Sequence, residues 1–520
     1  MIDLFYWILE NLLLVGVITG GFLVGAIATV YMQRRKKTAP SRDTQQPAIV
    51  NPQLGVTAPV VSPTMPASSA RSATVTKTAP PEVSSFQPGI NKEHAQQLLA
   101  MLTGSPPRHA TSFFYLVALL FMAICMVVLP CIYLALVGAS AYGVYWYATS
   151  FSNILHDPQF GTRAKLFLYF APLIGGSVVA LFMVKPLLAR SVKADAPISL
   201  RREEEPVLFA FVDRLCQLLG TAAPRRIDVD CQANASASLR YGLWSIFLPA
   251  DLVLTIGLPL ASGMNLRQFS GVLAHEFGHF AQGAGMRLSQ IIWTVNIWFA
   301  RVVYQRDSWD AALVALTKGL PIQVAPLFWP AHIGIWVSRG ILWLLMYLGF
   351  VISSFMSRQQ EFAADRYGAF LAGSDEFQKT SKKMLELNMA AQGAHGDLAR
   401  GFGKFTLPRN FPELCLHNVP QIPDYALQNA DSAMRHAKTG LFDTHPSTGD
   451  RIAAAESLEL KATFNPPDVP ASVLFRNFEK HCRDATLSYY RQIVGNAIQK
   501  EQLFPNETFL DTIAKMPARG

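Results

Sequence analysis

Two histidines four residues apart place the tightest constraint on this chain. His275-Glu276-Phe277-Gly278-His279 is an H-E-x-x-H sequence. Residues at positions i and i+4 lie on one face of an α-helix, so the two imidazoles can bind one Zn²⁺. Glu276 stands beside them, where its carboxylate can take a proton from zinc-activated water. The motif therefore predicts a zinc hydrolase, most often a peptidase.

The residues around the motif predict the helix that it needs. Phe269 and Val272 are apolar and fall on one face, and Asn265 is placed to cap the N-terminus. Phe280 extends the predicted helix past the second histidine. We therefore favour a metal site over a helix whose two histidines are merely surface residues.

A catalytic zinc site also needs a third protein ligand and an open position. Glu361 and Asp365 are four apart on a predicted helix, so both can face one site. One carboxylate would bind the metal, and the other would orient a ligand histidine. A pair with this spacing is usually a solvated helix face, but here Ala363 and Ala364 allow close helix packing.

His445 and Arg451 form a third candidate element, in T-H-P-S-T-G-D-R. A histidine and an arginine six residues apart could both reach a developing oxyanion. A His-Pro pair in a loop is, by itself, more often only a turn.

Taken in order, these motifs resemble the membrane zinc metallopeptidases of the HtpX and CAAX prenyl protease type. The resemblance is carried by H-E-F-G-H, S-R-Q-Q-E-F-A-A-D and T-H-P-S-T-G-D-R-I, and it covers residues 190–455. It implies a gluzincin-type α+β catalytic domain, in which a small sheet precedes the H-E-x-x-H helix.

The resemblance also implies a role for each motif residue. One Zn²⁺ per chain would be bound, and Glu276 would be the general base. Asp365 would not bind the metal itself but would orient a ligand histidine. Asn234 and Ala235 would bind substrate, near the edge strand that pairs with the substrate backbone. The implied zinc ligands are His275, His279 and Glu361, and the residues implied to stabilise the tetrahedral intermediate are His445 and Arg451.

The composition is typical of a membrane protein. The chain is 51% hydrophobic and only 16% charged, where soluble domains have roughly 25% charged residues. A net charge of +9 can indicate nucleic-acid binding. Here the basic clusters adjoin apolar runs, and no basic stripe with interleaved aromatic residues is present. We therefore expect a lipid bilayer and a protein or peptide substrate as partners, and no nucleic acid.

Residues 1–37 predict an N-terminal membrane anchor. Its apolar run is long enough to span a bilayer, and Arg34-Arg35-Lys36-Lys37 follows at once, which places this end in the cytoplasm. A signal peptide would instead carry its charge before the apolar core. Residues 38–110 are rich in Pro, Ala and Ser and predict a disordered linker with a short helix at 91–104. For that helix we favour a tether over a partner-binding segment.

Residues 111–189 predict two transmembrane helices, at 112–137 and 166–189. Between them, Tyr142 to Arg163 is aromatic and then polar, which favours a short outside loop. Basic residues after the second span place the next domain, residues 190–455, on the cytoplasmic side.

Within that domain, residues 288–356 predict a membrane hairpin. His279 and Glu361 must meet at one metal, so the chain between them must cross the membrane an even number of times. Two buried or interfacial helices are the alternative, because Arg301 and Arg339 are costly inside a bilayer.

The remaining elements are read from apolar patterns and breaks. We expect a helical C-terminal tail at 456–520 that docks on or covers the catalytic domain. We expect helices at Glu203–Leu219 and 471–500, strands at Ile227–Val229 and Ser245–Leu258, and a loop at Thr406–Asp424.

The predicted fold is a mainly α, multi-span membrane protein with an α+β catalytic domain. The predicted function is a membrane-bound zinc-dependent endopeptidase of the cell (inner) membrane, with its active site on the cytoplasmic side. The resemblance implies a role in membrane protein quality control. One alternative is a narrow processing peptidase for lipidated or membrane substrates. The other is a non-catalytic membrane scaffold or chaperone, against which the intact Glu276 argues.

Overall fold

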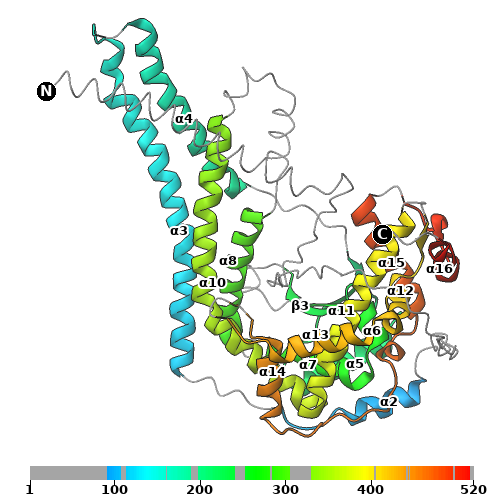
Figure 1. Cartoon of the computed structure of the whole chain (residues 1–520). Helices are drawn as coiled ribbons and strands as arrows, with labels where there is room; N and C mark the ends of the chain where they lie inside the picture. The colour runs from blue at the N-terminus through cyan, green and yellow to red at the C-terminus, as the bar shows by residue number, and fades with distance from the viewer. Residues whose placement is uncertain are drawn as a thin grey trace. The chain divides into compact units, whose positions relative to one another are not determined.

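A computed structural model describes the chain from residue 91 onward, with gaps. In the described residues the protein is mostly helical, with one four-stranded and one two-stranded sheet (Figure 1). This confirms the predicted mainly α fold class with a small sheet. The predicted anchor at 1–37 and most of the linker at 38–110 lie outside the described residues. The described residues are 91–106, 113–159, 161–188, 197–240, 252–281, 284–304, 329–402, 406–440, 443, 445–495 and 498–515.

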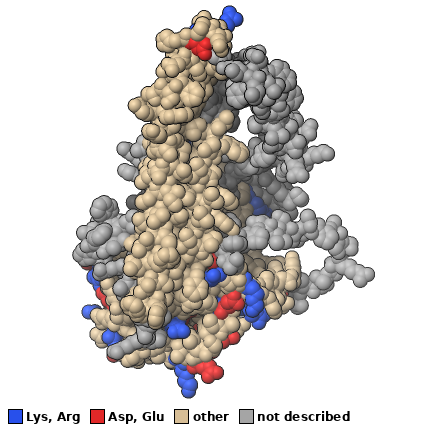
Figure 2. All heavy atoms as spheres, turned by 90° about the vertical axis from the view of Figure 1, so that its left-hand side faces the viewer, with Lys and Arg blue, Asp and Glu red and all other residues tan. Residues whose placement is uncertain are grey.

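Four apolar helices, from residues 113–188 and 284–372, pack against one another. Among the described residues, three of them are long and apolar enough to cross a membrane, and α8 adds a shorter apolar stretch. Large side chains such as Phe114 and Phe121 are exposed on α3, and Figure 2 shows a face without acidic or basic side chains along it. Such a surface suits lipid rather than water. The helices are α3 (Phe113–Ser150), α4 (Thr162–Leu188), α8 (Ala284–Tyr304) and α10 (Trp329–Ala372).

Hydrogen bonds donated by side chains join these helices. The hydroxyl of Tyr133 in α3 donates to the carbonyl oxygen of Met183 in α4 at 2.7 Å. Asn296 Nδ2 in α8 donates to Ser353 Oγ in α10 at 2.9 Å. In an apolar bundle such bonds satisfy polar groups that lipid cannot. α8 and α10 thus form the pair of helices that the sequence predicts as a membrane hairpin, and its crossing of the bilayer stays a prediction.

The loop expected from Tyr142 to Arg163 is only partly a loop. α3 continues to Ser150 because no proline interrupts it after Pro130. A short 3₁₀ helix, η1 (Ser152–Leu155), then makes the turn. The aromatic side chains expected in a loop belong to the helices instead: the hydroxyl of Tyr147 donates to the carbonyl oxygen of Leu168 at 2.6 Å.

The catalytic part is built on a sheet with the strand order β1-β2-β4-β3. β2 and β4 are parallel, and the outer strands β1 and β3 pair antiparallel to them. β3 is therefore an edge strand of the described sheet. The strands are β1 (Ile198–Ser199), β2 (Arg226–Asp230), β3 (Ala235–Leu239) and β4 (Leu252–Gly257).

Two predicted elements before the metal motif are observed with changed ends. The amphipathic helix is α5 (Pro206–Leu219); it begins at Pro206, which suits a first turn, and ends before Gly220 at φ 71°. The second predicted strand, β4, ends at Gly257, one residue earlier than expected. Leu258 begins α6 (Leu258–Gly263), with a proline in its first turn, and residues 241–251 lie outside the described part.

The helix of the H-E-x-x-H motif is α7 (Leu266–Gly278). Asn265 caps it as predicted, because its side-chain oxygen accepts the backbone N–H of Gln268 at 2.9 Å. The expected extension to Phe280 is wrong. α7 ends at Gly278, with His279 as its C-cap at φ −60° and ψ −34°, and the Phe280 N–H donates to the carbonyl oxygen of Phe277 at 2.9 Å.

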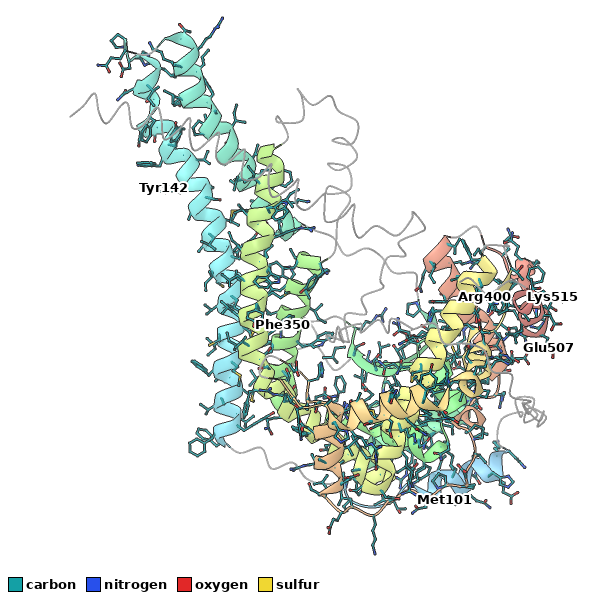
Figure 3. The ribbon with its side chains drawn as sticks, viewed as in Figure 1. Met101, Tyr142, Phe350, Arg400, Glu507 and Lys515 are labelled. Carbon is teal, nitrogen blue, oxygen red and sulfur yellow. The ribbon has the colours of Figure 1, made fainter. Side chains whose placement is uncertain are left out.

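The chain after α10 adds a second group of helices to the same core. The expected loop at Thr406–Asp424 is wrong in part, because Asn410 caps a helix there by accepting the N–H of Glu413 at 3.1 Å. Arg400 lies close to the last helix, α16, in Figure 3 and donates to the carbonyl oxygen of Ile513 at 2.8 Å. The helices are α11 (Ser374–Phe402), α12 (Phe411–Asn418), α13 (Asp424–His436), α14 (Thr448–Glu456), α15 (Phe478–Val494) and α16 (Asn506–Ala514).

Both ends of the described chain pack on this core. The predicted short helix is α2 (Lys92–Met101). Leu102, directly after it, is fully buried, and its carbonyl oxygen accepts from Arg214 Nη2 of α5 at 3.1 Å. Near the C-terminus, His481 of α15 lies 2.8 Å from the carboxylate of Glu205, at the start of α5.

Candidate metal centre

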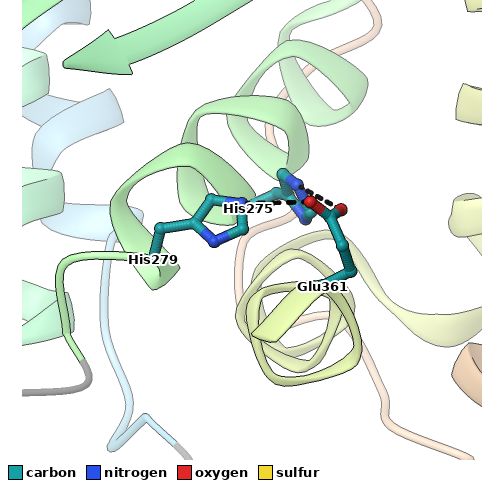
Figure 4. A group of neighbouring side chains, drawn as sticks. All are labelled: His275, His279 and Glu361. Carbon is teal, nitrogen blue, oxygen red and sulfur yellow. Dashed lines mark ion pairs between the residues drawn. The ribbon is translucent and has the colours of Figure 1, made fainter. Parts of the chain in front are cut away.

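Three side chains from two helices meet at one place (Figure 4). His275 and His279 come from the end of α7, and Glu361 comes from α10. His275 Nε2 lies 3.6 Å from Glu361 Oε2, and His279 Nε2 lies 3.9 Å from Glu361 Oε1. Two ligand atoms about 2.0 Å from one tetrahedral zinc would be roughly 3.3 Å apart. The three groups are therefore spaced so that a small cation fits between them.

Glycines let α7 and α10 come close enough for this meeting. A Cβ atom on Gly271 would lie 2.9 Å from the Cβ of Ala372, and one on Gly278 would lie 3.1 Å from the Cα of Ala364. The earlier glycine of α7, Gly271, faces Ala372, and the later one, Gly278, faces Ala364. The two helices therefore run in opposite directions. The seam between them places the end of α7 beside Glu361.

Asp365 holds the orientation of His275. Its Oδ1 lies 2.8 Å from His275 Nδ1, so the second ring nitrogen, Nε2, faces Glu361. Burial opposes a charge on this imidazole, but Asp365 outweighs burial and raises the pKa of His275. A carboxylate behind a histidine is the usual support for a metal ligand, because it selects the ring nitrogen that is offered.

Arg451 in turn holds Asp365. Its Nε donates to Asp365 Oδ2 at 2.9 Å and its Nη2 donates to Oδ1 at 2.6 Å. This two-point pairing of guanidinium and carboxylate is the strongest geometry for such an ion pair. The third nitrogen, Nη1, lies 3.6 Å from Glu361 Oε2. Arg451 therefore connects the supporting carboxylate with the carboxylate of the metal group.

His279 is suited to bind a cation as a neutral ring. Burial lowers the pKa of His279 to about 4, so its imidazole carries no proton on one nitrogen at neutral pH. A metal needs that free electron pair. Two imidazoles and one carboxylate form a donor set that suits zinc, whereas calcium and magnesium take oxygen ligands. The residues present thus fit the metal that the sequence predicts.

Glu276 lies beside the metal group, next to the edge strand. Its Oε2 accepts the backbone N–H of Ala237 in β3 at 3.2 Å. Burial raises the pKa of Glu276 to about 7. A carboxyl group with a pKa near the working pH can both accept and donate a proton.

His445 approaches from the segment between α13 and α14. Its Nδ1 lies 3.0 Å from Glu361 Oε1, and its side chain is 40% exposed. Asn234 and Ala235 lie further away, at the beginning of β3, and the carbonyl oxygen of Asn234 accepts the N–H of Gly257. The structure therefore brings six of the nine predicted residues into one connected group. Glu276 stands next to His275 in the chain, and Asn234 and Ala235 lie at the start of the strand that contacts Glu276.

Some residues of this group are missed by sequence reasoning. Ala237 contacts Glu276 through its backbone, and no side-chain pattern reports such a contact. Arg358 and Thr439 form hydrogen bonds in the segment that carries His445: Arg358 Nη1 donates to the carbonyl oxygen of Gly440, and Thr439 Oγ1 accepts the Ser447 N–H. Arg358 stands in the S-R-Q-Q-E sequence, one helical turn before Glu361, and that spacing is the signal that points to it.

Comparison with known proteins agrees with this geometry. The family model of peptidase family M48 matches residues 229–459. Protease HtpX of Stutzerimonas stutzeri (strain A1501) is 26% identical to this chain over 306 residues, which is 57% of this chain and 89% of that protein. The protease HtpX homolog of Janthinobacterium sp. (strain Marseille) is 26% identical over 310 residues, with 58% and 89% covered. No solved structure matches the chain.

The matched region and the metal centre coincide. Residues 229–459 begin in β2 and end just after α14. They therefore include the edge strand β3, the two helices that meet at His275 and Glu361, and Arg451. The apolar helices α3 and α4 precede this region. The chain is therefore similar to the HtpX proteases and, over residues 229–459, to peptidase family M48.

Proposed function

We propose that this protein is a zinc-dependent endopeptidase that hydrolyses peptide bonds at the His275–His279–Glu361 group. The observation that carries the proposal is the spacing of these three side chains, whose ligand atoms lie within 4.8 Å of one another. A bound Zn²⁺ would supply Lewis acidity, polarising the scissile carbonyl and lowering the pKa of a coordinated water.

Glu276 is the general base of the proposed reaction. It would take one proton from the attacking water and deliver it to the leaving amine as the C–N bond breaks. Its pKa of about 7 suits both steps at neutral pH. The Ala237 N–H keeps its carboxylate beside the edge strand.

The substrate backbone would pair with β3. Neighbouring residues of a strand point their backbone groups to opposite sides. The Asn234 carbonyl faces β4, where it accepts the Gly257 N–H, while the Ala237 N–H faces Glu276. By this alternation Ala235 and Ala237 present their N–H and carbonyl groups to the outer side. Pairing through backbone groups suits a peptidase with broad specificity.

His445 and Arg451 have different parts in the proposal. Arg451 is committed to Asp365 through two nitrogens, so we assign it mainly to holding the support of His275. His445 is 40% exposed and stands beside Glu361. We therefore assign His445 to the oxyanion that forms on the scissile carbonyl.

The surroundings favour an active site on the cytoplasmic side of the inner membrane. Lys185 lies in the last turn of α4, and Arg201 and Arg202 lie between α4 and α5, as the positive-inside rule expects. α10 joins an apolar stretch and Glu361 in one helix. Membrane or misfolded proteins within reach of that face would be the substrates, in membrane protein quality control.

The test measures metal content and casein cleavage of the full chain purified in detergent. We expect about one zinc per chain in the wild type and in Glu276→Gln, with cleavage lost in the variant. Glu479→Gln is the matched control, because that side chain is 50% exposed on α15, and it should cleave normally. Folded protein without zinc would overturn the proposal.

A further inference from the structure

The segment between α13 and α14, which carries His445, is closed at its base by hydrogen bonds. The Ser447 hydroxyl donates to the carbonyl oxygen of Ala437 at 2.8 Å, and the Ser447 N–H donates to Thr439 Oγ1 at 2.9 Å. Gly449 permits this approach: a Cβ there would lie 2.4 Å from the carbonyl oxygen of Arg435. The two ends of the segment are therefore held against each other.

Thr439 is the centre of this closure. Its hydroxyl donates to Asp450 Oδ2, and its backbone N–H donates to the same oxygen at 2.9 Å. The same hydroxyl accepts the Ser447 N–H. A threonine hydroxyl can donate one hydrogen bond and can also accept. Here it donates to Asp450 and accepts from Ser447, so it links these two residues. We call Thr439, Ser447 and Asp450 the clasp.

A second contact and a proline flank the clasp on the segment that carries His445. Arg358 Nη1 of α10 donates to the carbonyl oxygen of Gly440, next to Thr439, at 3.0 Å. Pro446 is buried and restricts the backbone of the residue before it. His445 thus stands next to this buried proline and two residues before Ser447 of the clasp, with its Nδ1 3.0 Å from Glu361 Oε1.

We propose that Thr439 is a positioning residue for His445: its hydroxyl closes the loop that holds the imidazole at the metal centre. The inference rests on the proposed function, because it assumes that His445 acts on the substrate. An imidazole displaced by about 1 Å loses much of its effect on a developing charge. The alternative is that the clasp only stabilises the loop. In that case, removing the clasp should lower kcat by the same factor whether or not His445 is present.

The experiment compares Thr439→Val, Thr439→Ser and His445→Ala in the full chain, with kcat and KM for fluorescein-labelled casein. Valine keeps the shape of threonine and removes the hydroxyl. We expect kcat to fall about tenfold in Thr439→Val, with KM and zinc content unchanged. Thr439→Ser should restore kcat. In the His445→Ala background, Thr439→Val should cause no further loss, because it acts through the missing imidazole.

Two further variants guard the result. Lys438→Ala is the matched control, since Lys438 contacts the same Asp450 at 3.7 Å with an 86% exposed side chain, and it should behave as wild type. If Thr439→Val does not fold, Asp450→Ala removes the same acceptor and should give the same loss of kcat.

Three outcomes overturn the inference. They are wild-type kcat in a folded Thr439→Val, equal loss in Thr439→Val and Thr439→Ser, and a full additional loss of kcat in the His445→Ala background. A failure of the proposed function is seen separately, as cleavage that survives Glu276→Gln.

Discussion

The two helices that meet at the metal centre belong to different surroundings. α7 has 13 residues, a capped start and nine buried residues in the core of the catalytic domain. α10 has 44 residues and contains one of the candidate membrane spans, Ile333–Ala372. Two ligands thus come from a short helix of the folded core, and the third comes from a helix continuous with the apolar bundle. The His275–His279–Glu361 group forms only where these two helices pack together.

The largest expected effect comes from the ligand that α10 supplies. Glu361→Ala should abolish zinc binding and casein cleavage, because two histidines alone leave the site short of a protein ligand. Metal content after dialysis against a weak chelator measures this. Glu386→Ala, on α11, is the control for removing a carboxylate elsewhere. Retention of one tightly bound zinc in Glu361→Ala would show that α7 alone makes the site.

The next largest effect tests the contact between His275 of α7 and Asp365 of α10. Asp365→Asn weakens the partner of His275 Nδ1 and of Arg451. We expect zinc affinity to fall about 10–100-fold, as for other residues that support a metal ligand. Competition with a fluorescent zinc chelator gives the affinity. Unchanged affinity would mean that His275 is oriented by its own helix.

The buried carboxylate of Glu205, at the start of α5, provides a comparison outside the four apolar helices. Glu205 is fully buried and accepts the N–H groups of Arg476 and Asn477 as well as His481 Nε2. Burial favours its neutral form, but these hydrogen bonds outweigh burial and lower the pKa of Glu205. Glu205→Gln should lower the free energy of unfolding by about 2 kcal/mol at pH 7.

The sign of the pH dependence follows from that lowered pKa. As the pH falls, Glu205 is protonated in the unfolded chain at a higher pH than in the folded chain. The contribution of Glu205 to the free energy of unfolding is therefore complete above the unfolded pKa of about 4.3. It is lost as the pH falls through the lower folded pKa. Urea unfolding of the two proteins should therefore differ at pH 7 and converge in acid. A difference that grows in acid contradicts this.

The seam between α7 and α10 gives a smaller effect. Gly271→Ala places a methyl group 2.9 Å from the Cβ of Ala372 and should destabilise the protein by about 1–2 kcal/mol. Ala372→Gly in the same chain should restore both stability and zinc affinity. Gly396→Ala on α11 meets nothing within 4 Å and should be neutral or stabilising. Absence of rescue by Ala372→Gly would show that the seam does not set the helix spacing.

The smallest expected effect concerns α7 alone. Asn265→Ala removes the cap of α7 and should lower the free energy of unfolding by about 1 kcal/mol. Zinc affinity should change little, because the ligands stand at the other end of the helix. Thermal unfolding and zinc titration of the variant measure both quantities. A large loss of zinc affinity would mean that the start of α7 controls its end.

Local patterns were sufficient for part of the fold and of the site. The spacing of His275 and His279 depends only on helical geometry, and the cap at Asn265 depends only on its near neighbours. The end of α3 and the helix α12 were misjudged for a related reason. Aromatic or polar composition favours a loop, but packing against other helices, as by Tyr147 on the carbonyl of Leu168, decides the outcome.

The sequence by itself determined the helical spacing of the metal motif, the apolar stretches long enough to span a membrane, and the chemical types of the candidate ligands. These are properties of neighbouring residues, set by the period of the helix and by hydrophobicity. Only the tertiary structure decided that Arg451 holds Asp365 across 86 residues and that Ala237 reaches Glu276 across 39. Such contacts depend on how α7, α10 and β3 pack, and glycine seams and backbone groups that direct this packing leave no periodic signal in the chain.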